Sequence, residues 1–261
     1  MISQKPYQYI KGWVEFYKLR FKVTPDVLIP RPETELIVDE ILHFLRPSEA
    51  HGEVSKKSSR LRSNKIFNLL DVGTGSGNIA ISLACNLPGC SVNFIASDIS
   101  SKALKVARQN AKLHGVLDRI KFVQSNLLSS SNNQSSVRSY KQLVQPNIIV
   151  ANLPYIPSER IPTLDSSVKD FEPHLALDGG RDGFELYRKL FQQISQLRMH
   201  KPGLKSKLQT GFERLKLIVC EIDHTHRETA LKEAKNYFPD AEIEVKLDLA
   251  HKQRILLVKL L

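Results

Sequence analysis

The sequence is short of cysteine, has no long apolar run and begins without a basic-then-apolar segment. Its 261 residues hold three cysteines, Cys85, Cys90 and Cys220, which are too few and too irregularly spaced for a disulfide framework. No Cys/His cluster has the spacing of a zinc site, so we expect no metal. No apolar run reaches the ~18 residues of a membrane span, and no secretion signal is recognisable. These absences favour a protein of the reducing cytoplasm without a membrane segment.

Acidic residues are also scarce relative to basic ones. There are 38 Lys and Arg residues against 27 Asp and Glu residues, which gives a net charge of +11. Such an excess favours contact with a polyanion such as RNA or a ribosome. Much of it falls in two polar stretches, residues 56–65 and 200–214, where it would serve equally well to keep the loops solvated. Ribosome or RNA contact through these basic loops is therefore one of two interpretations.

From residue 66 onward the apolar pattern predicts strands that alternate with helices. We expect strands at 66–72, 91–97, 120–123, 147–151, 216–221, 241–247 and 254–259, and helices at 78–85, 101–114, 182–197 and 227–237. This alternation implies crossover connections and a mainly parallel sheet, and the last two strands are able to pair as an antiparallel hairpin. Before it, we expect a half-exposed strand of a hairpin at 15–23, a helix at 33–45 and a flexible insertion at 47–65. The chain accordingly divides into residues 1–65 and an α/β domain at 66–261.

A glycine-rich turn follows the first of these strands. The turn consists of Gly73, Thr74, Gly75, Ser76 and Gly77. Glycine has no Cβ, so the backbone can turn sharply and a ligand can approach it closely. Asp98, at the end of the next strand, can accept hydrogen bonds from both hydroxyls of a ribose. The spacing differs from the Gly-x-Gly-x-x-Gly of a pyrophosphate site, which makes a dinucleotide less suitable than a mononucleotide-like cofactor. Asp71 is placed to hold the amino group of a methionine moiety, and Asn126 and Leu127 are placed to meet an adenine.

A second set of candidate site residues follows the strand at 147–151. These are Asn152, Leu153, Pro154 and Tyr155, of which Asn152 is also a candidate contact of the cofactor. If the Asn152 side-chain oxygen and the Leu153 carbonyl each accept an N–H from a planar nitrogen group, they stabilise the positive charge that develops when that nitrogen is alkylated. Pro154 biases Leu153 towards an extended conformation, and Tyr155 can pack against the planar acceptor. Beside a nucleotide-like cofactor, this tetrapeptide predicts methyl transfer to nitrogen from S-adenosylmethionine (SAM), with S-adenosyl-L-homocysteine as the product.

Two resemblances to known families extend this interpretation. The run from Asp71 to Gly77, with Asp98, resembles the nucleotide-binding motifs of class I SAM-dependent methyltransferases. That resemblance implies a Rossmann-like α/β fold with a mostly parallel seven-stranded sheet, helices on both faces and an antiparallel last strand, here preceded by a small β-hairpin. Residues 66–261 would then be the catalytic domain.

The second resemblance is narrower. Residues 28–35, Leu-Ile-Pro-Arg-Pro-Glu-Thr-Glu, are similar to a signature of the HemK-type protein-(glutamine-N5) methyltransferases. Further segments agree in the family's order, at 6–12, 171–177, 179–183 and 248–254. The resemblance implies methylation of the glutamine side-chain amide in the Gly-Gly-Gln loop of peptide-chain release factors. We therefore expect a monomer whose protein partner is a release factor.

The sequence departs from this family in several respects, and two of them bear on the substrate. Leu153 replaces the first proline of the usual Asn-Pro-Pro-Tyr, and Asn-Leu-Pro-Tyr is also the form of ribosomal RNA adenine dimethyltransferases. An adenine-N6 methyltransferase acting on RNA or DNA therefore stays open, as does a non-catalytic module that binds SAM or RNA. The sequence also begins close to the catalytic segments, without the family's helical N-terminal domain. We expect docking of the substrate to be weaker for that reason, or to be performed by the basic insertions.

Overall fold

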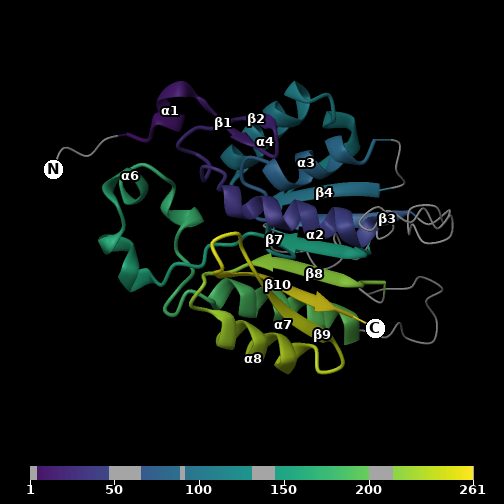
Figure 1. The fold of residues 1–261 in the computed structure, drawn as a ribbon. Helices are drawn as coiled ribbons and strands as arrows, with labels where there is room; N and C mark the ends of the chain where they lie inside the picture. The colour runs from purple at the N-terminus through teal and green to yellow at the C-terminus, as the bar shows by residue number, and fades with distance from the viewer. Residues whose placement is uncertain (1–4, 47–65, 89–91, 131–144, 200–213, 261) are drawn as a thin grey trace.

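The structure is a computed structural model that describes residues 5–46, 66–88, 92–130, 145–199 and 214–260. Its centre is an eight-stranded sheet in the order β6-β5-β4-β3-β7-β8-β10-β9 (Figure 1). The strands are β3 (Phe67–Val72), β4 (Val92–Asp98), β5 (Ile120–Asn126), β6 (Ser129–Ser130), β7 (Ile148–Ala151), β8 (Leu217–Glu221), β9 (Glu242–Leu247) and β10 (Gln253–Lys259). Strands β5, β4, β3, β7 and β8 are parallel, whereas β10 is antiparallel to both of its neighbours. The prediction of a mostly parallel sheet with an antiparallel last strand is confirmed, and the two-residue β6 adds an edge strand to the seven expected.

Alternate residues of the central strands pack on opposite faces of the sheet. Ile148 and Leu217 belong to a core shared with α2 (Glu35–Leu45) and α3 (Asn78–Asn86). Their neighbours Ile149 and Ile218 belong to a second core, shared with α7 (Glu185–Met199) and α8 (Arg227–Tyr237). Because both faces are covered, every residue of β7 and β8 is buried, which is why these strands are continuous apolar runs in the sequence.

The N-terminal hairpin differs in detail from the expected single strand at 15–23. It consists of β1 (Trp13–Phe16) and β2 (Leu19–Lys22), which follow α1 (Tyr7–Lys11). Tyr17 and Lys18 form the turn with φ of 49° and 61°. Asn and Gly usually occupy such left-handed positions, so this turn carries no recognisable sequence signal. The hairpin is fastened to α4 (Ser101–Leu113), where the Asn110 side-chain oxygen accepts the Lys22 amide N–H at 2.8 Å.

A segment of short helical turns separates β7 from α7. It contains η4 (Ser158–Thr163), α6 (Ser166–Lys169) and η5 (His174–Ala176), and it lies beyond the carboxyl end of β7 (Figure 1). Two further short turns are η1 (Pro32–Thr34), which leads into α2, and η3 (Leu117–Arg119), which leads into β5. An ion pair between Arg31 and Glu172 fastens the segment before α2 to the segment before η5. These elements build the surroundings of the cavity described below.

Several expectations fall outside the described residues. These concern the insertion at 47–65, nearly all of the basic stretch at 200–214, and Cys90. In the part of the chain that the structure describes, no helix is both long and apolar enough to cross a membrane. Within the same residues, no group of three or more His, Cys, Asp or Glu side chains is placed to hold a metal ion.

Candidate active site

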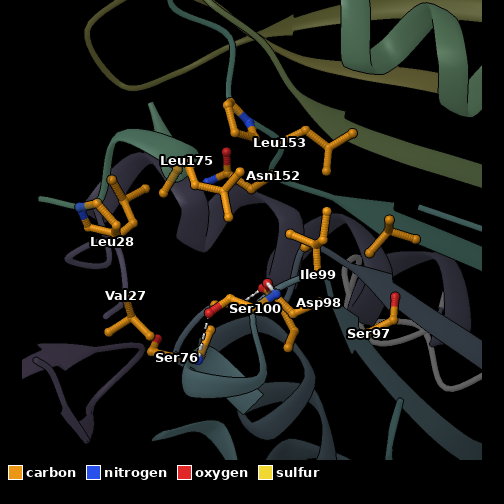
Figure 2. A pocket seen from close by; sticks show the side chains of 18 of the residues that line it. Val27, Leu28, Ser76, Ser97, Asp98, Ile99, Ser100, Asn152, Leu153 and Leu175 are labelled. Atoms are coloured by element: carbon orange, nitrogen blue, oxygen red, sulfur yellow. Dashed lines mark hydrogen bonds between the residues drawn. The ribbon is translucent and has the colours of Figure 1, made fainter. Parts of the chain in front are cut away.

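A cavity opens at the carboxyl ends of β3, β4, β5 and β7. Ligands of open α/β sheets bind at this edge, where the strand order reverses, and here the reversal falls between β3 and β7. The cavity is lined by two sets of predicted site residues: Gly73, Thr74, Gly75, Ser76, Asp98, Asn126 and Leu127 from the cofactor set, and Asn152, Leu153 and Pro154 from the acceptor set. Figure 2 shows Asn152 and Leu175 on one side of this space and Ser76, Asp98 and Ser100 on the opposite side.

The glycine turn is held in a conformation that needs glycine. Gly73, Gly75 and Gly77 have φ of 75°, 55° and 83°, in the left-handed region that side chains with a Cβ rarely adopt. A Cβ on Gly73 would lie 2.9 Å from Leu153 Cδ2, so the cofactor turn and the acceptor tetrapeptide touch at this point. Gly77 does not line the cavity; a Cβ there would lie 2.7 Å from Ile81 Cδ1, so its role is to let α3 begin directly after the turn.

The Asp98 carboxylate is anchored at the cavity wall by backbone donors. Its Oδ2 accepts the Gly75 N–H at 2.9 Å and its Oδ1 accepts the Ser100 N–H at 2.8 Å. Burial raises the pKa of Asp98, and these hydrogen bonds oppose that rise. A carboxylate has about four lone-pair sites, so each oxygen keeps capacity for a ligand hydroxyl. Ile99 and Leu127 line the same cavity and provide apolar surface close to this polar anchor.

Asp71 is, after Gly77, the second predicted cofactor residue that does not line the cavity. It is fully buried and is not among the residues that line the cavity. Its Oδ2 accepts hydrogen bonds from the Thr74 hydroxyl at 2.7 Å and from the Ala80 N–H at 3.3 Å, so it ties the turn to the start of α3. Its Oδ1 has no hydrogen-bond partner among the described residues. Burial raises the pKa of Asp71 from 3.8 to about 7, partly offset by the two hydrogen bonds.

The acceptor tetrapeptide is held by partners from distant parts of the chain. The Asn152 amide nitrogen donates to Thr34 Oγ1 and to Glu221 Oε2, both at 3.1 Å. Tyr155 does not line the cavity; its hydroxyl donates to Glu221 Oε1 at 3.0 Å. Burial and the nearby Glu221 carboxylate both raise the pKa of Tyr155, which keeps its hydroxyl protonated as a donor.

Leu153 is held through its backbone. Its N–H donates to the hydroxyl of the fully buried Tyr187 at 3.0 Å, and that hydroxyl donates in turn to the backbone carbonyl of Glu221. The Leu153 carbonyl oxygen lies 3.3 Å from the same hydroxyl. One tyrosine on α7 therefore contacts both backbone polar groups of the residue whose carbonyl is the second predicted acceptor.

Sequence reasoning did not assign roles to three residues of this site, Thr34, Glu221 and Tyr187. Thr34 lies in the 28–35 segment, which resembles a family signature but does not by itself indicate a role for this threonine. Glu221 carries the clearest signal, because it ends a strand of otherwise apolar residues and charged side chains are almost never fully buried without partners. Tyr187 has no comparable signal, since an aromatic residue on an amphipathic helix usually belongs to the core.

Comparison with known proteins places the chain in a family. Residues 63–154 match the family model described as a methyltransferase domain. A release factor glutamine methyltransferase of Staphylococcus aureus is 30% identical over 259 residues, which cover 99% of this chain and 77% of that protein. This chain belongs to the release factor glutamine methyltransferases. The recognition based on the 28–35 segment and on the glycine turn is thereby confirmed, and the family is one of SAM-dependent methyltransferases.

This chain covers a smaller share of some other similar proteins. A release factor glutamine methyltransferase of Chlorobaculum tepidum is 42% identical over 189 residues, 72% of this chain and 58% of that protein. A bifunctional methyltransferase of Rickettsia typhi is 37% identical over 224 residues, 85% of this chain and 40% of that protein. The chain thus spans about half the length of these two relatives.

Among solved structures, the chain resembles methyltransferases at low sequence identity. The human METTL16 catalytic domain in complex with an RNA hairpin gives a TM-score of 0.62 at 15% identity, covering 94% of this chain and 77% of that one. The N-terminal domain of human METTL16 in complex with S-adenosylhomocysteine gives a TM-score of 0.59 at 15% identity with the same coverage. These likenesses show the fold, which is the Rossmann-like methyltransferase fold that the sequence predicted.

Proposed function

We propose that this protein transfers the methyl group of SAM to the side-chain amide nitrogen of the glutamine in the Gly-Gly-Gln loop of a peptide-chain release factor. The observation that carries the proposal is the shared cavity. The glycine turn and Asp98 line it together with Asn152, Leu153 and Pro154. A donor site and a planar-nitrogen site on one cavity are what a direct transfer needs. Membership of the release factor glutamine methyltransferases supplies the acceptor.

The residues of the cavity fit SAM. Asp98 presents a fixed carboxylate to a ribose diol, while Ile99 and Leu127 present apolar surface suited to an adenine. Arg31 is the one cationic side chain among the described residues that line the cavity, and the guanidinium donors that its ion pair with Glu172 leaves unused suit the methionine carboxylate. When bound, SAM supplies a sulfonium methyl that is already activated for transfer, so alignment is the main requirement.

The acceptor residues act on the glutamine amide, whose nitrogen is a poor nucleophile because its lone pair is delocalised. In this proposal the Asn152 side-chain oxygen and the Leu153 carbonyl each accept one amide N–H. They thereby stabilise the positive charge that develops on nitrogen. The methylated amide is then cationic and strongly acidic, so it releases one proton to solvent without a strong base. The Tyr155 hydroxyl donates to Glu221, so in this proposal Tyr155 helps to hold the carboxylate that contacts Asn152.

The partner and the setting follow from the same proposal. The substrate protein is a release factor, and the setting is the cytoplasm, where translation takes place. Leu175 is 58% exposed and lines the cavity, which gives an incoming loop an apolar contact. We assign the chain as a monomer, with RNA or ribosome contact, if any, through its basic stretches.

The test is transfer of a labelled methyl group from SAM to purified release factor and to ribosomal RNA in one reaction, followed by digestion and mapping. We expect label on the Gly-Gly-Gln glutamine and none on a release factor in which that glutamine is alanine. Label on adenine would instead favour the nucleic-acid alternative, which the Asn-Leu-Pro-Tyr form and the net charge of +11 support.

A variant separates catalysis from cofactor binding. Asn152→Ala removes the side-chain oxygen and leaves Asp98 and the glycine turn in place. We expect SAM to bind with nearly unchanged affinity and turnover to fall about 100-fold or more, as for loss of one preorganised transition-state contact. Equal turnover in this variant would rule out the role assigned to Asn152.

A further inference from the structure

The Asn152 side chain can contribute to the proposed reaction in only one of its two orientations. An asparagine amide has an acceptor end and a donor end of nearly the same shape. With the oxygen facing the methyl acceptor, it can accept an N–H. With the nitrogen facing the acceptor, two donors would meet and the amide would be repelled. A residue that sets this orientation therefore controls turnover through Asn152.

We infer that Glu221 and Thr34 are positioning residues that fix the Asn152 amide with its oxygen free to face the methyl acceptor. The inference rests on the proposed function for its acceptor, but it applies to any planar nitrogen acceptor. Glu221 ends β8, Thr34 lies in η1 and Asn152 follows β7, so the three meet only in the folded chain. Nothing in the family resemblance assigned a role to either positioning residue.

The hydrogen-bond polarity of the cluster leads to one arrangement. The Thr34 hydroxyl is 2.6 Å from Glu221 Oε2, and an ionised carboxylate only accepts, so Thr34 must donate its single proton there. The Thr34 oxygen is then left with acceptor capacity alone. The Thr34 hydroxyl oxygen and Glu221 Oε2, which each lie 3.1 Å from the same end of the Asn152 side-chain amide, are therefore both acceptors. That end must be the nitrogen, and both of its protons are used.

The hydrogen-bond geometry around Glu221 favours the acceptor-only carboxylate. The side chains that face it are the hydroxyls of Thr34 and Tyr155 and the Asn152 amide, all of which donate to it. Burial raises the pKa of Glu221 above its ordinary value and the Glu33 carboxylate adds to that rise, whereas the hydrogen bonds from Thr34 and Tyr155 and the Arg254 guanidinium oppose it. Glu221 is only 1% exposed, so water does not compete for its oxygens. Three converging donors explain why a charge is retained at the end of a buried strand.

Matched variants of Thr34 provide the test in the full chain. Thr34→Val keeps the shape and removes the oxygen, while Thr34→Ser keeps the oxygen. We expect kcat to fall about tenfold in Thr34→Val, since one net hydrogen bond is worth roughly that factor. Thr34→Ser should stay within about threefold of the wild type. SAM affinity should be unchanged in both variants. Equal losses in valine and serine variants, or a kcat for Thr34→Val equal to the wild type, would overturn the inference.

Glu221→Gln tests the other positioning residue. It preserves size but introduces an NH₂ that can face Asn152 and stabilise the flipped amide. We expect kcat to fall by more than in Thr34→Val, again with SAM affinity retained. A Glu221→Gln enzyme with wild-type kcat would contradict the role of Glu221. If SAM affinity and the unfolding midpoint fall in step with kcat, Glu221 is a structural residue and the inference fails.

A second readout needs no acceptor substrate and so separates this inference from the proposed function. In ¹⁵N-labelled protein, the Asn152 side-chain amide signals can be assigned by their loss in Asn152→Ala. Both protons should exchange slowly with water in the wild type, and faster in Thr34→Val. Rapid exchange in the wild type would refute the inference even if glutamine is methylated. Slow exchange with no label on glutamine would refute the proposed function alone.

Discussion

Tyr187→Phe should show how strongly a single hydroxyl holds the acceptor peptide. The hydroxyl accepts the Leu153 N–H at 3.0 Å and donates to the Glu221 carbonyl. Phenylalanine keeps the ring, which packs 5.1 Å from the Phe184 ring, centroid to centroid. The loss is therefore confined to hydrogen bonding. A buried N–H left without a partner costs about 1–3 kcal/mol, so we expect the free energy of unfolding to fall by about 2 kcal/mol.

That loss can be followed in two assays. At about 2–4 °C per kcal/mol for a chain of this size, the unfolding midpoint should fall by about 4–8 °C, measured by circular dichroism. Turnover with labelled SAM should fall by a larger factor than SAM affinity, because the Leu153 carbonyl loses its support. Tyr237→Phe is the matched control. The Tyr237 ring packs on the Phe191 ring with 6.4 Å between centroids, and the Tyr237 hydroxyl makes no hydrogen bond with the described residues. If the two variants agree within about 0.5 kcal/mol and in kcat, the reasoning is refuted.

Three other predictions follow from the cofactor side of the cavity. Gly73→Ala and Gly75→Ala should each lower the free energy of unfolding by about 1–2 kcal/mol for their left-handed backbone. Only Gly73→Ala should also lower kcat at saturating SAM, because its Cβ meets Leu153 at 2.9 Å whereas that of Gly75 meets nothing within 4 Å; equal kcat values would contradict this. Asp98→Asn should weaken SAM binding about 10- to 100-fold by calorimetry, since hydrogen bonds to charged groups are worth about 1.5–3 kcal/mol, and unchanged affinity would remove Asp98 from the ribose site. The pKa of Asp71 is raised from 3.8 to about 7 in the folded protein, so its contribution to stability is complete below pH 3.8 and is lost as pH rises through 7. The full loss corresponds to about 4 kcal/mol. Chemical denaturation of Asp71→Asn should therefore give a flatter stability profile between pH 4 and 8 than the wild type, and parallel profiles would show that Asp71 is ionised throughout.

The fold was largely predictable because its signals are local. The apolar runs of the parallel strands and the glycine turn each lie within a few consecutive residues, and they place the cavity edge correctly. The hairpin was predicted less well, because Tyr17 and Lys18 adopt positive φ without the residues that usually mark such a turn. There the pairing of β1 with β2 and the packing of the hairpin on α4 override local preference.

The candidate site was predictable only in part, for a different physical reason. The residues that line its cavity belong to short motifs that can be recognised in the sequence. The residues that hydrogen-bond to them lie far away along the chain. Thr34 and Glu221 are 187 positions apart, and Asn152 and Glu221 are 69 apart. No periodicity or spacing encodes such a contact, because it arises only when the strand order brings β7 beside β8.

The close approach of Gly73 and the Leu153 side chain bears on the distance between the two sides of the cavity. A Cβ added to Gly73 would lie only 2.9 Å from Leu153 Cδ2, so the glycine turn and the acceptor tetrapeptide are closely packed at this point. In the proposed reaction, the Leu153 side chain would therefore set the separation between the methyl donor and the methyl acceptor. A misplacement of about 1 Å between reacting atoms can slow a reaction about 100-fold. The size of the side chain at position 153 would therefore affect the rate of transfer as well as the packing.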